Sequence, residues 1–475
     1  MLFPTTDFAI FFCIVFLMHW LLKPSSTPWK VFMILASYVF YAWWDFRFVA
    51  LLAGVSLVAQ LGGIVVWRTE NERFRRLALV LALTATLLPL VYFKYYSFFT
   101  LNLANALDSF GAGSVVPLLQ ITLPVGISFF TFMAISYIVD IYRKELVPAG
   151  WMDFFLYLSF FPHLVAGPIV RGHELIPQLK RPRNPRRIDF SRATWLILGG
   201  LFKKVVVSSY VATTIVDPVF ADPGRHAALE VLLAIYGYAV VIYADFSGYT
   251  DIAIGIAMLL GYHFPENFNR PYIARSLQDF WRRWHITLSR WLRDYLYIPL
   301  GGSKKGGVRT YVNIIITMVL GGLWHGAGWT FVVWGTLHGV GQAVGHFRRT
   351  RRIAAGLTPQ ANEPGAIARQ RIVTFHIVCL GWVFFRADSI GSALDVLARL
   401  VTGWPEPAAL VSLLLIAVIA GMIGLQWLPG RVSGRVQVAF SRMAPVLQGV
   451  FLALALFVIT TLGPQGVAPF IYFQF

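Results

Sequence analysis

The sequence predicts an all-α polytopic membrane protein with about 10 to 12 membrane segments. Composition is the first reason: 57% of the 475 residues are hydrophobic and only 13% are charged, and the mean hydropathy is +0.66. The apolar runs are also long, which suits helical spans of about 20 residues and not the alternating segments of about ten residues of a transmembrane barrel. Finally, Lys and Arg collect after alternate runs, as they do in cytoplasmic loops.

The charge and the cysteine content argue against other classes of protein. A net charge of +18 would suit a nucleic-acid-binding protein. In a polytopic membrane protein it follows from the cationic residues of cytoplasmic loops, so we expect no nucleic-acid partner. The two cysteines, Cys13 and Cys379, stand alone in apolar runs. They are too few and too far apart in sequence for a disulfide framework or a thiolate metal site.

The first five predicted spans alternate in the charge of their flanks. The amino terminus has no cationic residue before its first apolar run and no Ala-x-Ala-like cleavage site. We therefore predict an uncleaved span and a non-cytoplasmic amino terminus. Positive charge follows the first, third and fifth spans, whereas the tips at Asp45 and at residues 101–114 carry little. These spans cover residues 7–22, 31–44, 48–66, 77–96 and 116–141.

Residues 151–170 are apolar but are not predicted to cross the membrane. A full crossing would place the basic run from Arg171 to Arg187 on the wrong face, and Pro162 and Pro168 interrupt a helix. We predict a re-entrant or interfacial segment, which is tolerated only where protein covers its backbone or where it lines a cavity.

The next two predicted spans, residues 193–216 and 231–260, cross outward and back. The second contains Asp245 and Asp251 in apolar surroundings. Because these residues are six positions apart, they lie on different faces of one helix and do not form a carboxylate pair. We expect each of them to bond to a tyrosine or an arginine within the bundle.

Residues 262–309 are predicted to be cytoplasmic or interfacial. Trp281, Trp284 and Trp291 recur at helical spacing, with arginines on the other faces. This pattern indicates one amphipathic helix in the interface, with its aromatic side chains at the level of the lipid headgroups.

The next apolar segment is interrupted by Gly-Gly-Leu-Trp-His-Gly-Ala-Gly. Residues 311–324 reach only about 20 Å as a helix, too short to span the membrane, and residues 329–346 return to a basic run. We therefore predict a broken hairpin that dips from the cytoplasmic side, with His325 near its tip at mid-depth. A single continuous span through His325 is the alternative, and it would require a further re-entrant segment.

The remaining sequence completes a single membrane-embedded domain with an external carboxyl terminus. We find no internal repeat, so a transporter built from two symmetric halves is not supported. The last predicted spans cover residues 372–387, 408–428 and 444–463, with Arg431, Arg435 and Arg442 marking an inside loop. We expect amino-terminal spans over residues 1–150, a catalytic core over 151–346 and carboxyl-terminal spans over 347–475.

His325 is the strongest candidate among the ten histidines. An ionisable side chain at membrane depth is costly, which makes it a functional-site hypothesis by default. The surrounding glycines allow a close backbone approach or a helix break, as a site for a long substrate would need. Histidine can take a proton from a hydroxyl near neutral pH. A structural histidine bonded to a neighbouring helix is the alternative.

The other histidines carry weaker signals. His285 lies beside the tryptophans of the predicted amphipathic helix, where a role near the site and a structural role are both open. For His338 and His163 the pattern favours a structural role.

A glycine-rich loop supplies three cationic candidates, Lys304, Lys305 and Arg309. They could hold phosphate groups, or they could form an ordinary cytoplasmic loop. The sequence has no Walker motif, no G-x-S-x-G elbow and no clustered set of metal ligands. These absences argue against ATP-driven transport and serine hydrolysis.

Two long runs stand out, YADFSGYTDIAIGIAMLLGYHFPENFNRPYIARSLQDFWRRWHITLSRWLRDYLYIPLGG and NIIITMVLGGLWHGAGWTFVVWGTLHG. They closely resemble the bacterial polysaccharide branch of the membrane-bound O-acyltransferase (MBOAT) family, and within it the membrane subunits of alginate O-acetyltransferases. In the amino-terminal half, LPVGISFFTF and SFFPHLVAGPI are also similar to that branch.

The resemblance implies a helical bundle around a central tunnel that passes acyl groups from a cytoplasmic donor toward an extracytoplasmic acceptor. The family's catalytic histidine maps onto His325 in LWHGAGW, and its second motif histidine maps onto His285 in WRRWHITLSRW. We expect no metal and no permanently bound cofactor. The candidates for binding the donor are Trp324, Trp284, Lys304, Lys305 and Arg309.

We therefore expect an acetyltransferase of the bacterial inner membrane with both termini in the periplasm. It would take acetyl groups from acetyl-CoA or another acyl thioester. An extracytoplasmic serine-dependent acetyltransferase would pass them to an exopolysaccharide, for which alginate is the first choice. Cellulose, peptidoglycan and teichoic acid are the alternatives within the family. Outside it, a non-catalytic channel or exporter for polysaccharide or lipid would use the same hairpin and histidine as a gate.

Overall fold

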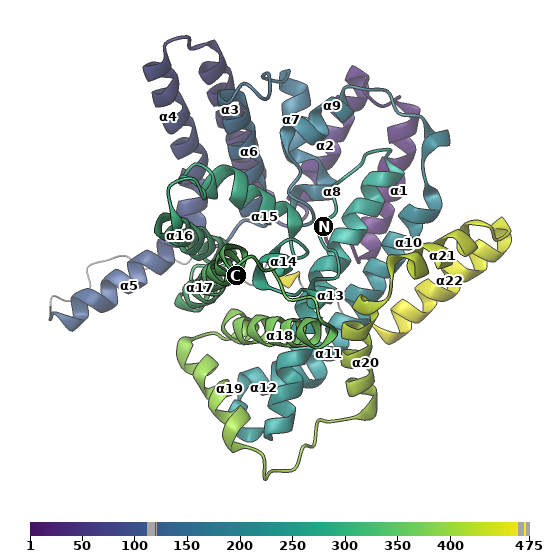
Figure 1. The fold of residues 1–475 in the computed structure, drawn as a ribbon. Helices are drawn as coiled ribbons and strands as arrows, with labels where there is room; N and C mark the ends of the chain where they lie inside the picture. Colours follow the sequence, from purple (N-terminus) through teal and green to yellow (C-terminus); the bar gives the residue numbers. More distant parts are fainter. Residues whose placement is uncertain (112–118, 120, 464–469, 472–475) are drawn as a thin grey trace. The chain divides into compact units, whose positions relative to one another are not determined.

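A computed structural model describes the chain except residues 112–118, 120, 464–469 and 472–475. The described residues form helices and no strands, which confirms the predicted all-α class (Figure 1). The chain divides into two compact units. The first is Met1–Ala193 with Ala253–Pro265, and the second is Thr194–Ile252 with Glu266–Phe475.

The helices confirm a multi-pass membrane protein. Among the described residues, seven helices are long and apolar enough to cross a membrane. Three shorter apolar helices, Thr6–Leu21, Ile127–Tyr142 and Leu413–Trp427, bring the apolar segments to the lower end of the predicted number. The seven are Arg47–Arg68, Glu72–Ser109, Phe190–Ala221, Ala228–Leu259, Gly307–His325, Pro364–Arg386 and Pro445–Leu462.

The first unit contains helices whose starts are specified locally. Thr5, Ser26 and Asn71 each cap a helix by accepting a hydrogen bond from a backbone N–H. The helices are α1 (Thr6–Leu21), α2 (Thr27–Ala42), α3 (Arg47–Arg68), α4 (Glu72–Leu90), a π-helical turn (Val91–Tyr95), α5 (Tyr96–Ser109) and α6 (Ile127–Tyr142). Helix α3 packs against both α4 and α6.

Two predicted boundaries in this unit are wrong. The span expected over residues 77–96 belongs to a longer helix, Glu72–Ser109, because the leucines and alanines of the expected tip favour helix. Helix α6 begins at Ile127, after Gly126 in the left-handed region (φ +76°). Residues 112–114 of the expected tip and 116–118 and 120 of the expected fifth span lie outside the described residues.

The predicted break within residues 151–170 is confirmed. Helix α7 (Trp151–Ser159) ends before α8 (Phe161–Leu164), which has Pro162 in its first turn, and α9 (Gly172–Leu179) follows. Helix α7 is only about 14 Å long, too short to cross a membrane. His163 Nε2 lies 3.1 Å from the Tyr157 carbonyl oxygen, so His163 anchors this break, as its structural reading predicts.

Long helices also begin the second unit. The predicted spans over 193–216 and 231–260 are helical. The first is a continuous run of α10 (Phe190–Leu201), π-helical Phe202–Ser208, α11 (Ser209–Val211), π-helical Ala212–Val216 and α12 (Asp217–Ala221), and the second is α13 (Ala228–Leu259). Shorter turns of this unit lie at Pro223–Arg225, Pro271–Ile273 and Arg293–Tyr297, and one at Pro185–Arg187 belongs to the first unit.

The single amphipathic helix predicted around the tryptophans is wrong. Helix α14 (Leu277–Trp281) and helix α15 (Ile286–Leu292) are separate, because His285 adopts a left-handed backbone (φ +41°). Trp281, Trp284 and Trp291 are also buried in the protein and do not stand at an exposed interface. Their spacing therefore reports burial against other helices and not one continuous helix.

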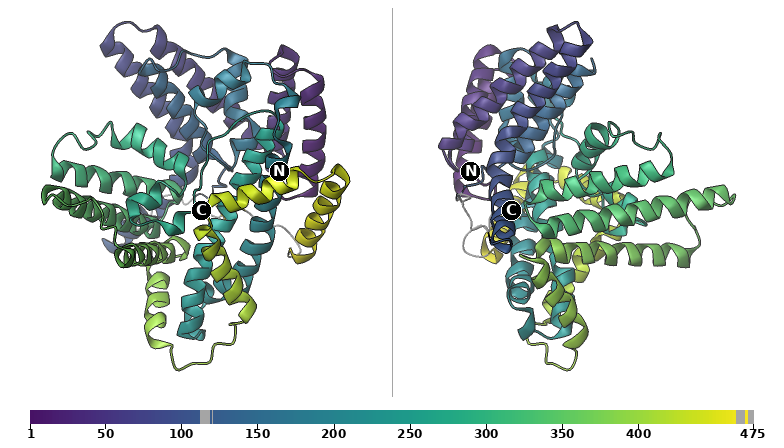
Figure 2. Two further views of the ribbon diagram at one scale, coloured as in Figure 1. Left: turned by 45° about the vertical axis from the view of Figure 1, so that its right-hand side comes forward. Right: turned by 90° about the vertical axis from the view of Figure 1, so that its left-hand side faces the viewer.

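The predicted hairpin around the glycine interruption is present. Helix α16 (Gly307–His325) and helix α17 (Trp329–Ala354) lie side by side, and α18 (Pro364–Arg386) lies next to α17 (Figure 2). A Cβ at Gly322 or Gly335 would overlap the backbone of the other helix, so glycine allows this close approach. The prediction that the first arm is too short to span is wrong, because the polar residues from Gly307 extend it to 19 residues.

The carboxyl-terminal part contains the three predicted apolar helices and two that were not predicted. The predicted ones correspond to α18, α20 (Leu413–Gly424) with the turn Leu425–Trp427, and α22 (Pro445–Leu462). The others are α19 (Ile390–Thr402) and α21 (Gly430–Ser441). Helix α21 occupies the expected inside loop around Arg435.

Candidate active site

His325 is the last residue of α16, at the turn of the hairpin. Only 2% of it is exposed. Its imidazole packs edge-on against Trp334 of α17 and Phe385 of α18, with ring centroids 5.0 Å and 5.3 Å apart. Two neighbouring helices therefore fix the ring. The predicted place of His325, at the break between the two arms of the hairpin, is confirmed.

Glycine is required directly after His325. A Cβ at Gly326 would overlap the ring of Phe331. That ring packs edge-on against Phe385, with centroids 5.1 Å apart. Gly326 therefore allows close packing around His325, and at this point it does not make room for a long substrate.

His285 lies at the amino-terminal end of α15. Its left-handed backbone costs a non-glycine residue about 1–2 kcal/mol and persists only where the surroundings hold it. Asn267 supplies that support, because its carbonyl oxygen accepts the Ile286 N–H at 2.9 Å and its Oδ1 lies 3.1 Å from His285 Nδ1. The imidazole is fully buried, and burial lowers the pKa of His285 to about 3.

The indole of Trp324 joins the two histidines. Its ring centroid lies 5.0 Å from that of His325 and 5.9 Å from that of His285. Phe246 of α13 covers another side of His285, with ring centroids 4.7 Å apart. The structure therefore brings together three of the predicted site residues, His285, His325 and Trp324, in one buried cluster of the second unit.

Trp284 belongs to the same aromatic cluster but reaches His325 through other rings. It packs on Trp382 with centroids 5.0 Å apart, and Trp382 stacks on Trp334 at 6.0 Å. Trp334 then contacts His325. This position suits support of the cluster better than contact with a donor.

His338 is a third buried histidine near the cluster, and its contacts support a structural role. Trp281 Nε1 donates a hydrogen bond to His338 Nδ1 at 3.3 Å. Because Nδ1 accepts, a neutral ring carries its proton on Nε2. The ring also contacts Trp334, with centroids 4.7 Å apart. His338 therefore ties α14 to α17.

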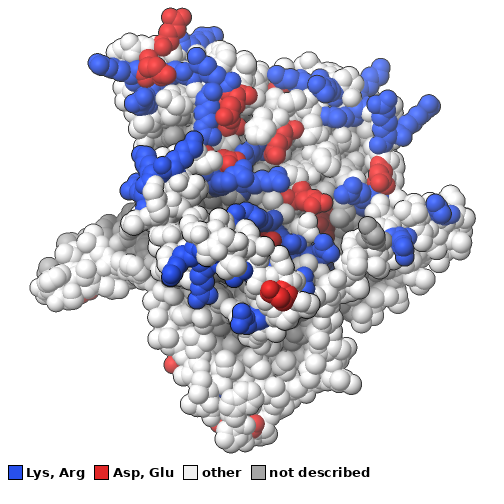
Figure 3. Space-filling view, in the orientation of Figure 1, with Lys and Arg blue, Asp and Glu red and all other residues white. Residues whose placement is uncertain are grey.

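The three basic candidates do not lie at the histidines. All three are exposed. Arg309 lies near the start of α16, about 24 Å from His325 along the helix axis, and Lys304 and Lys305 precede the helix. Figure 3 shows Lys and Arg gathered over α14 to α17, whereas the surface over α12 and α19 is almost uncharged.

Two ion pairs, one buried and one partly exposed, correct the expected partners of Asp245 and Asp251. Lys203 Nζ lies 2.5 Å from Asp251 Oδ2 and 2.9 Å from Ser247 Oγ, and Lys204 pairs with Asp245. Lysine, and not tyrosine or arginine, therefore balances each carboxylate. Two lysines in one apolar span and two aspartates in the next form the sequence signal for this pairing.

Asn267 is a further residue that the sequence did not single out. It lies in the segment before α14 and reaches His285 across 18 positions of the chain. A lone asparagine in a polar loop carries no local signal for such a contact.

The described part of the chain contains no group of three or more His, Cys, Asp or Glu side chains that could hold a metal ion. Both cysteines are free, Cys13 exposed and Cys379 buried.

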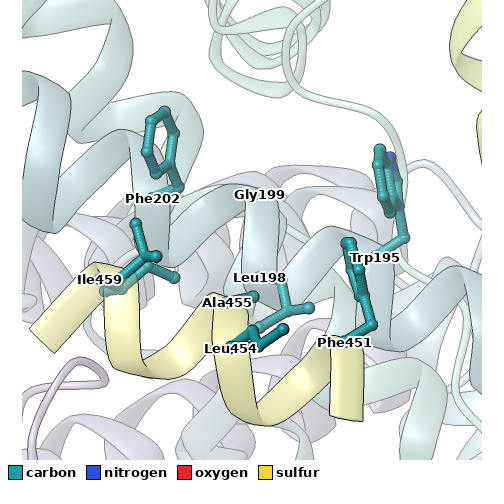
Figure 4. Close-up of a pocket in the computed structure, with 9 residues that line it drawn as sticks. Trp195, Leu198, Gly199, Phe202, Phe451, Leu454, Ala455 and Ile459 are labelled. Carbon is teal, nitrogen blue, oxygen red and sulfur yellow. The ribbon is translucent and has the colours of Figure 1, made fainter. Parts of the chain in front are cut away.

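An apolar groove of about 540 Å³ lies along α10 and α22 (Figure 4). Its volume would hold a small ligand. Its lining contains no acid, base or histidine that could transfer a proton, so this groove is not the reaction centre. The lining residues are Trp195, Leu198, Gly199, Phe202, Phe451, Leu454, Ala455, Val458 and Ile459.

Comparison with known proteins shows the family. Residues 141–381 match the family model described as MBOAT, membrane-bound O-acyltransferase family. The chain belongs to the MBOAT family. The matched residues include Asn267, His285 and His325, so this MBOAT chain carries its histidine cluster within the region that defines the family.

Several MBOAT relatives cover most of the chain. The probable alginate O-acetylase AlgI of Azotobacter vinelandii is 40% identical over 409 residues, 84% of this chain and 78% of that protein. Its counterpart in Pseudomonas putida is 34% identical over 504 residues, the whole of both chains. The peptidoglycan O-acetyltransferase of Helicobacter pylori is 36% identical over 406 residues, 78% of this chain and 73% of that protein. This MBOAT chain is therefore an O-acyltransferase, and it requires an acyl donor.

Proposed function

We propose that this MBOAT enzyme moves acetyl groups from cytoplasmic acetyl-CoA across the bacterial inner membrane for O-acetylation of an exopolysaccharide, alginate. The alginate O-acetylase relatives support this acceptor, and one of them aligns over the whole chain. The observation that carries the proposal is the burial of His325 at the hairpin turn, beside Trp324 and within the cluster that holds His285.

The chemistry follows from a base in apolar surroundings. A hydroxyl oxygen attacks the carbonyl carbon of the thioester, and the carbon–sulfur bond breaks. His325 takes the hydroxyl proton as general base and returns it to the leaving sulfur. The products are an acetyl ester and a free thiol. The aromatic rings around His325 exclude water, which would otherwise hydrolyse the thioester, and His285 positions the donor or the acceptor.

The donor and the acceptor approach from opposite sides in this proposal. Lys304, Lys305 and Arg309 attract the phosphates of acetyl-CoA from the cytoplasm. The acetyl group leaves for the serine hydroxyl of an extracytoplasmic acetyltransferase, which passes it to the polymer. Both termini of the chain lie in the periplasm, as the alternation of charged loops predicts.

Peptidoglycan is the second candidate acceptor. The Helicobacter pylori relative supports it, since that protein is named for peptidoglycan O-acetylation and is 36% identical. Ester-linked acetate measured on purified alginate, peptidoglycan and cellulose from matched strains, with and without the enzyme, decides the acceptor.

The deciding experiment for the reaction is His325→Ala. We expect the variant to reach the membrane at the normal level and polymer export to continue, while acetate per sugar falls to background. His346→Ala is the matched control, because His346 lies on the same hairpin near its other end, and we expect normal acetylation. Loss of export with unchanged acetylation per chain would instead identify a channel. If His325→Ala changed neither quantity, the catalytic role of His325 would be refuted.

A further inference from the structure

The amide oxygen of Asn267 is the meeting point of three hydrogen bonds. It lies 3.1 Å from His285 Nδ1, 3.1 Å from the Thr287 backbone nitrogen and 2.8 Å from Thr287 Oγ1. Asn267 itself is buried, with 1% exposed. One side chain therefore joins both residues that flank the first residue of α15.

These contacts decide the tautomer of His285. A backbone N–H can only donate, so the Asn267 atom that faces Thr287 N is the oxygen and not the amide nitrogen. His285 Nδ1 must then donate to the same oxygen and carries the proton. In a neutral imidazole the other nitrogen, Nε2, is the acceptor.

The backbone around Asn267 holds the same turn. The Ile286 N–H donates to the Asn267 carbonyl oxygen at 2.9 Å, and the Asn269 N–H donates to the Arg283 carbonyl oxygen at 2.8 Å. These two bonds fasten the segment before α14 to the residues on both sides of His285. The left-handed conformation of His285 is thereby fixed together with its side chain.

The ring of His285 is buried between aromatic side chains. The rings of Phe246 from α13 and Trp324 from α16 pack against it, and the Asn267 amide meets its Nδ1. Burial disfavours the imidazolium form. A neutral ring whose N–H is used by Asn267 can act toward a substrate only as an acceptor.

We propose that Asn267 is a positioning residue of the acyl transfer, which holds His285 as the Nδ1–H tautomer so that Nε2 faces the reacting groups as acceptor. This inference rests on the proposed function, because it gives His285 a part in the transfer. Nε2 then accepts a hydrogen bond from the thiol that leaves, once His325 has returned the proton to the sulfur, and Asn267 itself touches no reacting group.

Asn267→Asp tests the proposal most directly. The carboxylate keeps the acceptor for His285 and Thr287. The Asn267 Nδ2 that it replaces has no hydrogen-bond partner among the described residues, so no described bond is lost. A negative charge beside the ring favours the imidazolium form, which cannot accept at Nε2. We expect acetyl-CoA-dependent transfer within about threefold of the wild type at pH 8.5, and an acid limb of the pH–rate profile shifted upward by at least about one pH unit.

Two further variants separate positioning from stability. Asn267→Leu removes the acceptor, and we expect kcat to fall at least about 30-fold with the KM for acetyl-CoA unchanged. Thr287→Val removes the hydroxyl bond to the same oxygen and leaves the His285 contact, and we expect less than a threefold change. If Asn267→Leu fails to fold, the pH–rate profile of Asn267→Asp decides whether the proposal holds.

The proposal is overturned if the Asn267→Asp profile coincides with that of the wild type, or if a folded Asn267→Leu variant keeps the normal kcat. Failure of the proposed function looks different, because His325→Ala would then retain transfer or the wild type would show none with acetyl-CoA. Normal wild-type transfer that depends on His325 but is indifferent to Asn267 would refute only the present inference.

Discussion

The imidazole of His325 meets the indole of Trp334 edge-on, with ring centroids 5.0 Å apart and ring planes at 83°. The same indole contacts His338, which is anchored by Trp281. Aromatic contacts of this kind fix the position of a ring. The described contacts of His325 therefore hold its imidazole in one place at the turn of the hairpin.

Trp324 is predicted to matter through its place between the two histidines. Trp324→Ala removes the ring that both imidazoles contact, so we expect kcat for acetyl transfer to fall at least about tenfold, as misplaced catalytic groups do. Trp324→Phe keeps a ring there and should retain most of the activity. Trp404→Ala, at an exposed indole, is the control. A Trp324→Ala enzyme with wild-type kcat would contradict the assigned geometry.

The place of His325 could be predicted because its signal is local. A histidine among glycines inside an apolar segment stands out in any reading of hydropathy. Asn267 could not be predicted, because its contact with His285 depends on a turn that the folded structure stabilises. No Gly or Pro marks the break between α14 and α15, since a histidine occupies its left-handed position.

The spacing of the tryptophans predicted neither their surroundings nor the course of the backbone. Trp281, Trp284 and Trp291 were expected at the level of the lipid headgroups, whereas the structure buries all three in the protein. The set still spans two helices, because spacing does not record whether the backbone between them is helical. The hydropathy pattern likewise predicted α16 to be too short, because the first turn from Gly307 is polar but helical.

The close packing of the α16–α17 hairpin should make Gly335 sensitive to a single methyl group. A Cβ at Gly335 would lie 2.9 Å from Val319 Cα, so Gly335→Ala should destabilise the protein by about 1–3 kcal/mol, the range of overpacked cores. The measurement is reversible unfolding in detergent.

Gly345→Ala is the matched control on the same helix. No heavy atom lies within 4 Å of the Cβ position there, and replacing a helical glycine with alanine should stabilise by up to about 1 kcal/mol. Equal effects of the two substitutions would contradict the packing described for the hairpin.

Removing one partner of the Lys204–Asp245 pair should lower the free energy of unfolding more than replacing both partners. Both side chains are 3% exposed, so Lys204→Met leaves a buried carboxylate and should cost about 3–5 kcal/mol. The double variant Lys204→Met/Asp245→Asn removes both charges, keeps an acceptor for the Ile471 N–H and should recover much of that loss. A double-mutant cycle of unfolding free energies measures the coupling.

The neighbouring pair provides a comparison within the same helices. Lys203 and Asp251 are 17% and 29% exposed, so Lys203→Met should cost less than Lys204→Met because water screens the remaining charge. For the Lys204–Asp245 pair, a double variant whose loss of unfolding free energy equals the sum of the two single losses would show that the two residues are not coupled.

The basic end of α16 should affect donor capture and not the chemical step. Lys304→Gln/Lys305→Gln/Arg309→Gln removes three exposed charges. Arg309 lies about 24 Å from His325 along α16, too far to touch the thioester carbon, and the two lysines precede that helix. We expect the KM for acetyl-CoA to rise about three- to tenfold at low salt with kcat unchanged, and the difference to shrink as salt screens the attraction. Arg435→Gln, at an exposed arginine of α21, should leave KM unaltered. A fall in kcat at saturating donor would instead place these side chains in the transfer step, and an unchanged KM would identify them as an ordinary cytoplasmic loop.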